Sequence, residues 1–148
     1  MSVIGDDGPA QVSLSEKLAG KKAVVFALPG AFTRTCSASH VPSFIRAMDD
    51  LKAKGVDAVF CISVNDPFVL HAWGESTGAT AAGIEMLGDA DASFTMAIGA
   101  EFSAPPVGLL NRSARYSALV EDGVVKSLHV DEPGVCDLSS GQRILDDL

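Results

Sequence analysis

Two segments of different pattern flank the stretch Pro29-Gly30-Ala31-Phe32-Thr33-Arg34-Thr35-Cys36-Ser37. The run before it, Ala23–Leu28, is apolar throughout and predicts a buried strand. The segment after it, roughly Ser37–Lys54, places apolar residues on one helical face, and Gly55 is a suitable end for that helix. The apolar residues are Val41, Phe44, Ile45, Met48 and Leu51. Cys36 is therefore expected in or near the first turn of a helix that follows a strand.

The start of a helix favours reactivity in a cysteine. Unpaired backbone N–H groups and the positive end of the helix dipole meet there. Both favour the thiolate, which is the nucleophilic form of the side chain. The alternative is a buried structural cysteine without a chemical role. Because Cys36 follows a Pro-Gly turn at a helix start, we interpret it as a candidate nucleophile.

The composition is that of a globular protein. Of the 148 residues, 47% are hydrophobic and 20% are charged, and this length suits one domain over residues 1–148. No apolar stretch reaches the roughly 20 residues that cross a bilayer, and the N-terminal residues lack the pattern of a secretory signal. The net charge of −8, without a basic stripe, argues against nucleic acid and anionic membranes as partners.

The three cysteines do not form the pattern of a secreted disulfide framework, because their number is odd and no two are close in sequence. The absence of a C-x-x-C motif argues against a dithiol redox site and against a zinc ribbon. Such usage suits a reducing compartment, so we expect a cytoplasmic protein. An organelle-targeting segment that has been removed is left open as an alternative.

The order of predicted elements indicates an α/β protein with a central mixed sheet flanked by helices. Residues 1–22 are polar, with one short helix expected at Ser13–Ala19 and capped by Ser13. A second helix is expected from a cap at Asn65-Asp66 to about Thr77. The remaining predictions are strands at 58–64 and 84–87, a helix at 93–98, an irregular loop at 99–111, a hairpin of 115–120 with 124–130, and a terminal helix from Ser139 or Ser140 to Leu148.

Three further side chains could act on Cys36. Thr33 could cap the helix, or it could donate a hydrogen bond to the sulfur or to an oxygen near it. Pro29 could simply end the strand, or it could shield the thiolate from water. Arg115 opens a predicted strand, where arginines are commonly solvated. If the fold brings Arg115 to Cys36, its guanidinium would stabilise the thiolate and a developing negative oxygen.

Other residues with reactive side chains favour structural interpretations. His40 could form a Cys–His pair with Cys36 for hydrolysis, but no third orienting group is evident, so a hydrogen-bonded structural residue is preferred. Cys61 lies in an apolar strand and is expected to be a small buried residue. Cys136 lies in a polar loop before the last helix and is expected to be accessible. The histidines show no metal-ligand spacing.

The motif P-x-x-x-T-x-x-C, formed by Pro29, Thr33 and Cys36, closely resembles the active-site segment of peroxiredoxins, specifically the type II or peroxiredoxin-5-like group. The resemblance covers roughly residues 12–148. It continues through His40-Val41-Pro42-x-Phe44, Cys61-Ile62-Ser63-Val64-Asn65-Asp66-Pro67-Phe68-Val69 with Ala72-Trp73, Arg112-Ser113-x-Arg115-Tyr116 and Asp122-Gly123-Val124-Val125.

The resemblance implies a thioredoxin-like fold and a thiol-dependent peroxidase that acts on hydrogen peroxide and small organic hydroperoxides. It implies Cys36 as the peroxidatic cysteine, with Pro29, Thr33 and Arg115 as its active-site companions. Cys36 would become a sulfenic acid, which a thiol must reduce. No metal or bound organic cofactor is implied. The family habit and the acidic composition suggest a homodimer.

The resemblance leaves the resolving step and the alternatives to a peroxidase open. The resolving thiol could be Cys136, although the family's C-terminal resolving cysteine aligns near Leu138. Glutathione, glutaredoxin or thioredoxin could instead reduce Cys36 directly. One alternative function is a thiol–disulfide oxidoreductase, which the missing C-x-x-C disfavours. Another is a non-catalytic binding module, in which Thr33 and Arg115 would have no chemical purpose.

Overall fold

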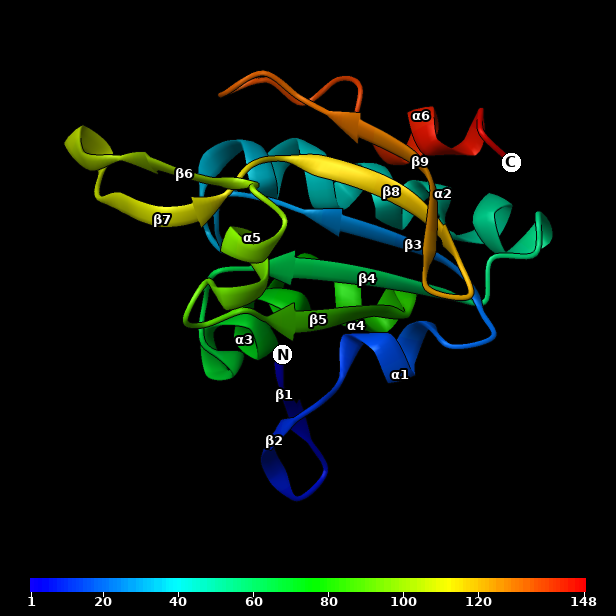
Figure 1. Ribbon diagram of the computed structural model, residues 1–148, viewed down its shortest axis with the longest axis horizontal. Coiled ribbons are helices and arrows are strands. Elements are labelled where there is room, and N and C mark those ends of the chain that lie inside the picture. The colour runs from blue at the N-terminus through cyan, green and yellow to red at the C-terminus, as the bar shows by residue number, and fades with distance from the viewer.

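A computed structural model describes residues 1–148 of the chain (Figure 1). Its centre is a seven-stranded sheet with the strand order β2-β1-β5-β4-β3-β8-β9, and β6 and β7 form a separate two-stranded sheet. The strands are β1 (Ser2–Gly5), β2 (Gly8–Gln11), β3 (Lys22–Ala27), β4 (Ala58–Ser63), β5 (Ile84–Gly88), β6 (Glu101–Ala104), β7 (Leu109–Ser113), β8 (Tyr116–Glu121) and β9 (Val124–Val130).

The helices are mostly short. They are α1 (Leu14–Leu18), the π-helix η1 (Cys36–His40), α2 (Val41–Ala53), α3 (Pro67–Thr77), α4 (Ala79–Ala82), α5 (Ser93–Ala97), the 3-10 helix η2 (Pro105–Val107) and α6 (Gly141–Leu145). None of them combines the length and the apolar character needed to cross a lipid bilayer.

The central sheet is mixed. β3, β4 and β5 run parallel, whereas β8 pairs antiparallel with β3, and β9 pairs antiparallel with β8. β1 and β2 form an antiparallel hairpin that joins the sheet through β5. Every residue of β3 after Lys22 and of β4 after Ala58 is buried, as expected for central strands that are covered on both faces. The predicted mixed sheet flanked by helices is confirmed.

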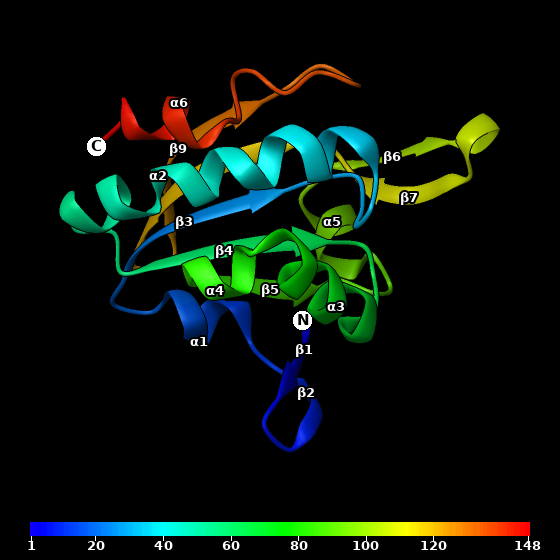
Figure 2. The same cartoon turned by 180° about the vertical axis from the view of Figure 1, so that it is seen from behind.

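Helices cover the two faces of this sheet unequally (Figures 1 and 2). α2, α3, α4 and α6 lie on one face and enclose the larger core, which contains Phe26, Trp73 and Cys36. The other face has a smaller core around Val25 and Phe60. Only α1 and α5, with five residues each, pack against that face. The second face is consequently only partly covered.

Capping residues mark the helix starts as predicted. The Ser13 hydroxyl accepts a backbone N–H of α1, and the Asp66 carboxylate accepts one of α3. The hairpin of β8 and β9 is also confirmed. Its turn places Asp122 and Gly123 at φ values of 47° and 77°, the left-handed conformation that short hairpin turns require.

Two expectations are wrong. Residues 99–111 are expected to be an irregular loop but contain β6, η2 and most of β7. The Pro105-Pro106 pair dominates this segment in the sequence, and the two strands beside it are short, exposed and joined with an irregular register. Residues 1–22 are expected to contain only a helix, but β1 and β2 precede it. Their four-residue length and polar composition hide the alternation by which strands are recognised.

Candidate active site

Cys36 lies at the start of the helix that follows β3. The chain leaves β3 through Pro29-Gly30, and Phe32 then adopts a φ of 61°, which turns the backbone into the helix. In the first helical hydrogen bond, the Ser37 N–H donates to the Thr33 carbonyl at 3.0 Å. Residues 36–40 form the π-helical turn η1, which continues directly into α2. Cys36 is fully buried at the first position of this turn.

Arg115 lies against the sulfur of Cys36. Its side chain is only 5% exposed. Its Nη2 donates to Cys36 Sγ at 3.3 Å, and its Nε donates to the Val135 carbonyl at 2.9 Å. The third nitrogen, Nη1, is buried without a partner. Because a guanidinium stays charged at any ordinary pH, this contact stabilises negative charge on the sulfur. The structure thus brings together two of the candidate residues, 79 positions apart in sequence.

Side chains from three directions hold the turn Pro29-Gly30-Ala31. Ala31 donates its backbone N–H to Asn65 Oδ1 at 3.0 Å. The Pro29 carbonyl accepts a hydrogen bond from Arg112 Nη1 at 3.4 Å. The Gly30 carbonyl accepts one from the Thr33 hydroxyl at 2.8 Å. A Cβ atom at the central glycine would lie 2.7 Å from Arg112 Nη1, so a side chain there would displace the arginine. The Thr33 hydroxyl therefore neither caps the helix nor bonds to the sulfur in this structure, but braces the turn.

Asn65 and Arg112 are site residues that the sequence reasoning missed. Asn65 is expected to share the cap of α3, but Asp66 alone caps it, and Asn65 instead contacts the turn before Cys36. The order of the strands in the sheet could have indicated the position of Asn65. β3 and β4 are parallel neighbours, so the residues that follow their carboxyl ends meet at one edge of the sheet.

A small cavity of about 90 Å³ lies beside Arg115. Pro29 and Phe102 form one part of its wall, and residues 131–134 form another. A water molecule occupies roughly 30 Å³ in the liquid, so the cavity has room for a molecule of only a few heavy atoms. Pro29 is thus placed at the same small space as the guanidinium.

His40 does not pair with Cys36. Its Nε2 lies 3.0 Å from the Ser139 carbonyl, which can only accept, so Nε2 carries the proton. Burial, helped by the charge of Arg115, lowers the pKa of the ring to about 4. A neutral imidazole bonded to a backbone carbonyl fits the structural interpretation of His40 and not the hydrolytic one.

The loop that carries Cys136 is held by a buried carboxylate. Asp131 accepts the Leu138 N–H at 2.7 Å and also hydrogen-bonds to the Ser139 hydroxyl, while its own N–H donates to the Arg115 carbonyl at 3.0 Å. Together with the bond from Arg115 to Val135, these contacts dock the loop 131–139 onto the arginine that contacts the sulfur.

The two other cysteines differ in environment. Cys61 is completely buried in β4, as expected, and burial raises the pKa of its thiol. Cys136 is half-buried, so it is less accessible than the polar loop sequence suggests. Burial also raises the pKa of Cys136, which the charge of Arg115 offsets in part. All three cysteines are free thiols.

Comparison with known proteins places the chain in a family. The family model described as Redoxin matches residues 3–144. Peroxiredoxin-2C of Oryza sativa subsp. japonica is 42% identical over 141 residues, which cover 95% of this chain and 86% of that relative. The chain belongs to the peroxiredoxin family. The family predicted from the P-x-x-x-T-x-x-C motif is therefore confirmed.

Further comparisons agree on the fold of this peroxiredoxin. Reduced Prx3 from Vibrio vulnificus, solved in complex with H2O2, has a TM-score of 0.93 and 45% identity, covering 99% of this chain and 90% of that one. The expected thioredoxin-like fold is thereby confirmed. Chloroplastic peroxiredoxin-2E-2 of Oryza sativa subsp. japonica is 49% identical over 136 residues. That match covers 90% of this chain but only 60% of the chloroplastic relative.

The buried His40 predicts an acid-sensitive fold. The unfolded chain takes up a proton at His40 near pH 6.5, whereas the folded chain does so only near pH 4, so stability falls as the pH drops between these values. At a pH of about 4.5 this loss is about 2 to 3 kcal/mol relative to neutral pH. We expect His40→Gln, whose amide can still donate to Ser139, to lose much less stability over the same range.

Urea unfolding of both proteins at about pH 7 and about pH 4.5 measures this difference. Wild type and His40→Gln losing equal free energies of unfolding would contradict a neutral buried His40 as the source of the acid sensitivity.

Proposed function

We propose that this chain is a thiol peroxidase that reduces hydrogen peroxide and small alkyl hydroperoxides, with Cys36 as the peroxidatic cysteine. The 3.3 Å contact from Arg115 to Cys36 carries this proposal, because it places the permanent positive charge of the guanidinium beside a buried sulfur. The similarity to the Vibrio vulnificus protein that was solved with H2O2 supports the same class of substrate.

The reaction would proceed by in-line displacement at oxygen. The thiolate attacks the terminal peroxide oxygen, an S–O bond forms as the O–O bond breaks, and Cys36 becomes a sulfenic acid. The sulfur loses two electrons to the peroxide, whose other oxygen leaves as hydroxide or alkoxide and takes a proton from water. Arg115 and N–H groups at the helix start would stabilise the negative charge on that oxygen.

Pro29 and Thr33 would shape the approach of the peroxide. Pro29 borders the cavity beside Arg115 and has no N–H to offer to water. We propose that the Thr33 hydroxyl exchanges its bond to the Gly30 carbonyl for one to the peroxide. The small cavity favours small substrates. Because Cys36 is fully buried, the loop 131–139 would have to shift to admit them.

The sulfenic acid would be resolved by a thiol. We propose Cys136 as this thiol, because Arg115 docks its loop and contacts Cys36 with the same guanidinium. Its attack would form an S–S bond and release water, and glutathione, glutaredoxin or thioredoxin would then reduce the disulfide. The electrons thus come from an external thiol, without a resident metal or organic cofactor.

Two alternative functions predict different activities. A thiol–disulfide oxidoreductase would reduce insulin disulfides without consuming peroxide, and a binding module would do neither. Arg115 disfavours both, since protein disulfides do not require a buried guanidinium at the sulfur, and a binding module does not require the pair at all.

We further propose that residues 1–148 form one domain and that the protein works in a reducing compartment, in the first place the cytoplasm. The relative named as chloroplastic supports an organelle as the alternative. Fractionation of cells that produce the full-length protein distinguishes these locations.

Cys36 and Arg115 should both be required for peroxide consumption with dithiothreitol as the reductant. Cys36→Ser should abolish it. Arg115→Ala should lower kcat/KM about 100-fold, because one charged donor to the developing oxyanion is lost. Arg46→Ala, which removes an exposed arginine of α2, is the matched control and should leave the rate unchanged. Equal rates for wild type and Cys36→Ser would reject the peroxidase.

The resolving role of Cys136 predicts a Cys36–Cys136 disulfide after one equivalent of peroxide. Mass spectrometry of the non-reduced protein should identify the cross-linked peptide, and Cys136→Ser should instead accumulate sulfenic and sulfinic Cys36. Cys61→Ser serves as the control and should retain the disulfide. If wild type yields only glutathionylated or sulfinic Cys36, the role of Cys136 is refuted while the peroxidase proposal stands.

We also propose a homodimer. Phe32 and Phe68 are 62% and 63% exposed, and aromatic side chains left in water are typical of interfaces. Sedimentation velocity should give twice the mass of one chain, and Phe68→Glu should shift the population toward the monomer. Val124→Glu, at an exposed apolar position of β9, is the control. A wild-type monomer at micromolar concentration would exclude this dimer.

A further inference from the structure

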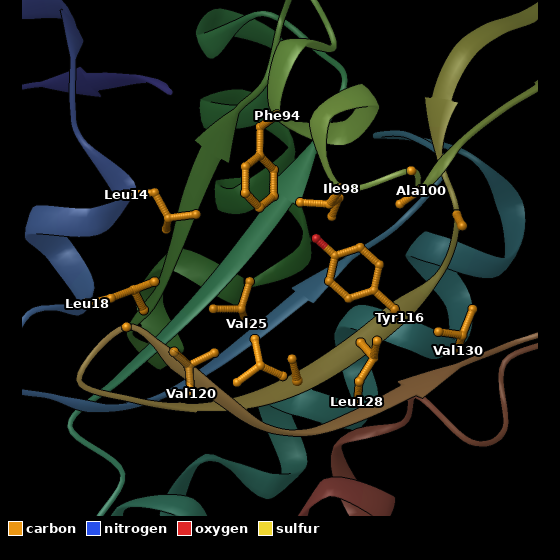
Figure 3. A pocket seen from close by; sticks show the side chains of 15 residues that line it. Leu14, Leu18, Val25, Phe94, Ile98, Ala100, Tyr116, Val120, Leu128 and Val130 are labelled. Carbon is orange, nitrogen blue, oxygen red and sulfur yellow. The ribbon is translucent and has the colours of Figure 1, made fainter.

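The less covered face of the central sheet contains an apolar hollow of about 420 Å³ (Figure 3). Fifteen residues line it, and thirteen of them are hydrophobic. α1 contributes Leu14 and Leu18, α5 contributes Phe94, and the strands contribute Tyr116 and Leu128. No charged residue belongs to the lining.

The hollow exists because the covering helices are too short. α1 and α5 have five residues each, while β8 and β9 have six and seven. As a result, Ile98, Val125, Leu128 and Val130 of the lining remain between 49% and 57% exposed. Clustered apolar side chains left in water mark sites of interaction.

Tyr116 gives this hollow a specific polar group. Its side chain is only 6% exposed, and its oxygen points into the space between Phe94, Ile98 and Val25 (Figure 3). The hydroxyl makes no hydrogen bond within the chain, and the apolar side chains around it cannot supply one. The oxygen itself is not among the enclosed polar atoms of the chain, so a ligand in the hollow can reach it. Burial raises the pKa of Tyr116, so the hydroxyl keeps its proton and remains a donor.

We propose that this hollow binds one neutral, mainly apolar small molecule, and that Tyr116 donates a hydrogen bond to a carbonyl or hydroxyl oxygen of that molecule. The volume lies within the range of small-molecule sites, roughly 300 to 1,000 Å³. An anion is disfavoured because the lining has no cation and the protein carries a net charge of −8. A partner protein would reach the recessed hydroxyl only by inserting a side chain.

This site is separate from the proposed peroxidase chemistry. Successive residues of a strand point to opposite faces of a sheet. Arg115 contacts Cys36 in the larger core, whereas Tyr116, the next residue, belongs to the smaller core on the other face. Loss of ligand binding and loss of peroxide turnover can therefore be observed independently.

Three naphthalene probes of similar size test the proposal by isothermal titration calorimetry and by amide shifts in NMR spectra. 2-Acetonaphthone carries a neutral carbonyl, 2-ethylnaphthalene carries no oxygen, and 2-naphthoate is an anion. We expect saturable binding of one 2-acetonaphthone per chain, with shifts in β8 and β9. 2-Ethylnaphthalene should bind about three- to tenfold more weakly, because it lacks one hydrogen bond, and 2-naphthoate should bind weakest.

Two variants assign the binding to the hollow. Tyr116→Phe keeps the ring and should weaken 2-acetonaphthone about three- to tenfold while leaving 2-ethylnaphthalene unchanged. Leu128→Trp fills the hollow from its exposed edge and should abolish binding of both. Both variants should consume peroxide like wild type, which shows that they are folded.

Several results would overturn the proposal. These are no saturable binding up to the solubility limit, equal weakening of both neutral probes by Tyr116→Phe, or undiminished binding to Leu128→Trp. Sedimentation that shows two copies of the chain joined through this face, with dissociation in Leu128→Trp, would assign the hollow to self-association instead.

Discussion

The contact between the guanidinium of Arg115 and the sulfur of Cys36 is the interaction on which the rest of the site depends. A buried charge is unfavourable unless it is paired or fully hydrogen-bonded. Arg115 uses only Nε and Nη2, and its Nη1 is unpaired. The contact of Nη2 with the Cys36 sulfur compensates part of this deficit, because sulfur accepts a hydrogen bond and would attract the guanidinium more strongly if it became negative. The same positive charge helps to keep His40 neutral.

The sheet topology makes this contact possible. β8 lies antiparallel beside β3, so the start of β8, which Arg115 directly precedes, meets the end of β3, where the turn to Cys36 begins. Asn65 comes to the same place because β4 is the other neighbour of β3. Arg115 also reaches the loop of Cys136 through Val135. One central strand with two neighbours thus brings together the candidate nucleophile Cys36, the guanidinium of Arg115 and the residues that support the turn.

The sequence predicted the parts of the molecule that depend on local signals. Apolar runs located β3 and β4, and Ser13 and Asp66 marked helix starts through their short polar side chains. It could not place Arg115 at Cys36, because that contact joins residues far apart and only a resemblance pointed to it. Nor did it predict the π-turn at Cys36–His40, since this changes the backbone hydrogen bonds without disturbing the apolar spacing after Val41. Asn65 is expected to cap a helix because a sequence shows which residues adjoin it in the chain but not which residues lie beside it across the sheet.

The distance of Arg115 from Cys36 along the chain has a consequence for biosynthesis. Ribosomes add about 5–20 residues per second, and the two residues are 79 positions apart. Cys36 is therefore made about 4 to 16 seconds before its charge partner. Throughout that interval the nascent polypeptide has the thiol without the guanidinium. If the proposed peroxidase function holds, sensitivity to oxidants arises only once Arg115 has been made and the chain has closed around the sulfur.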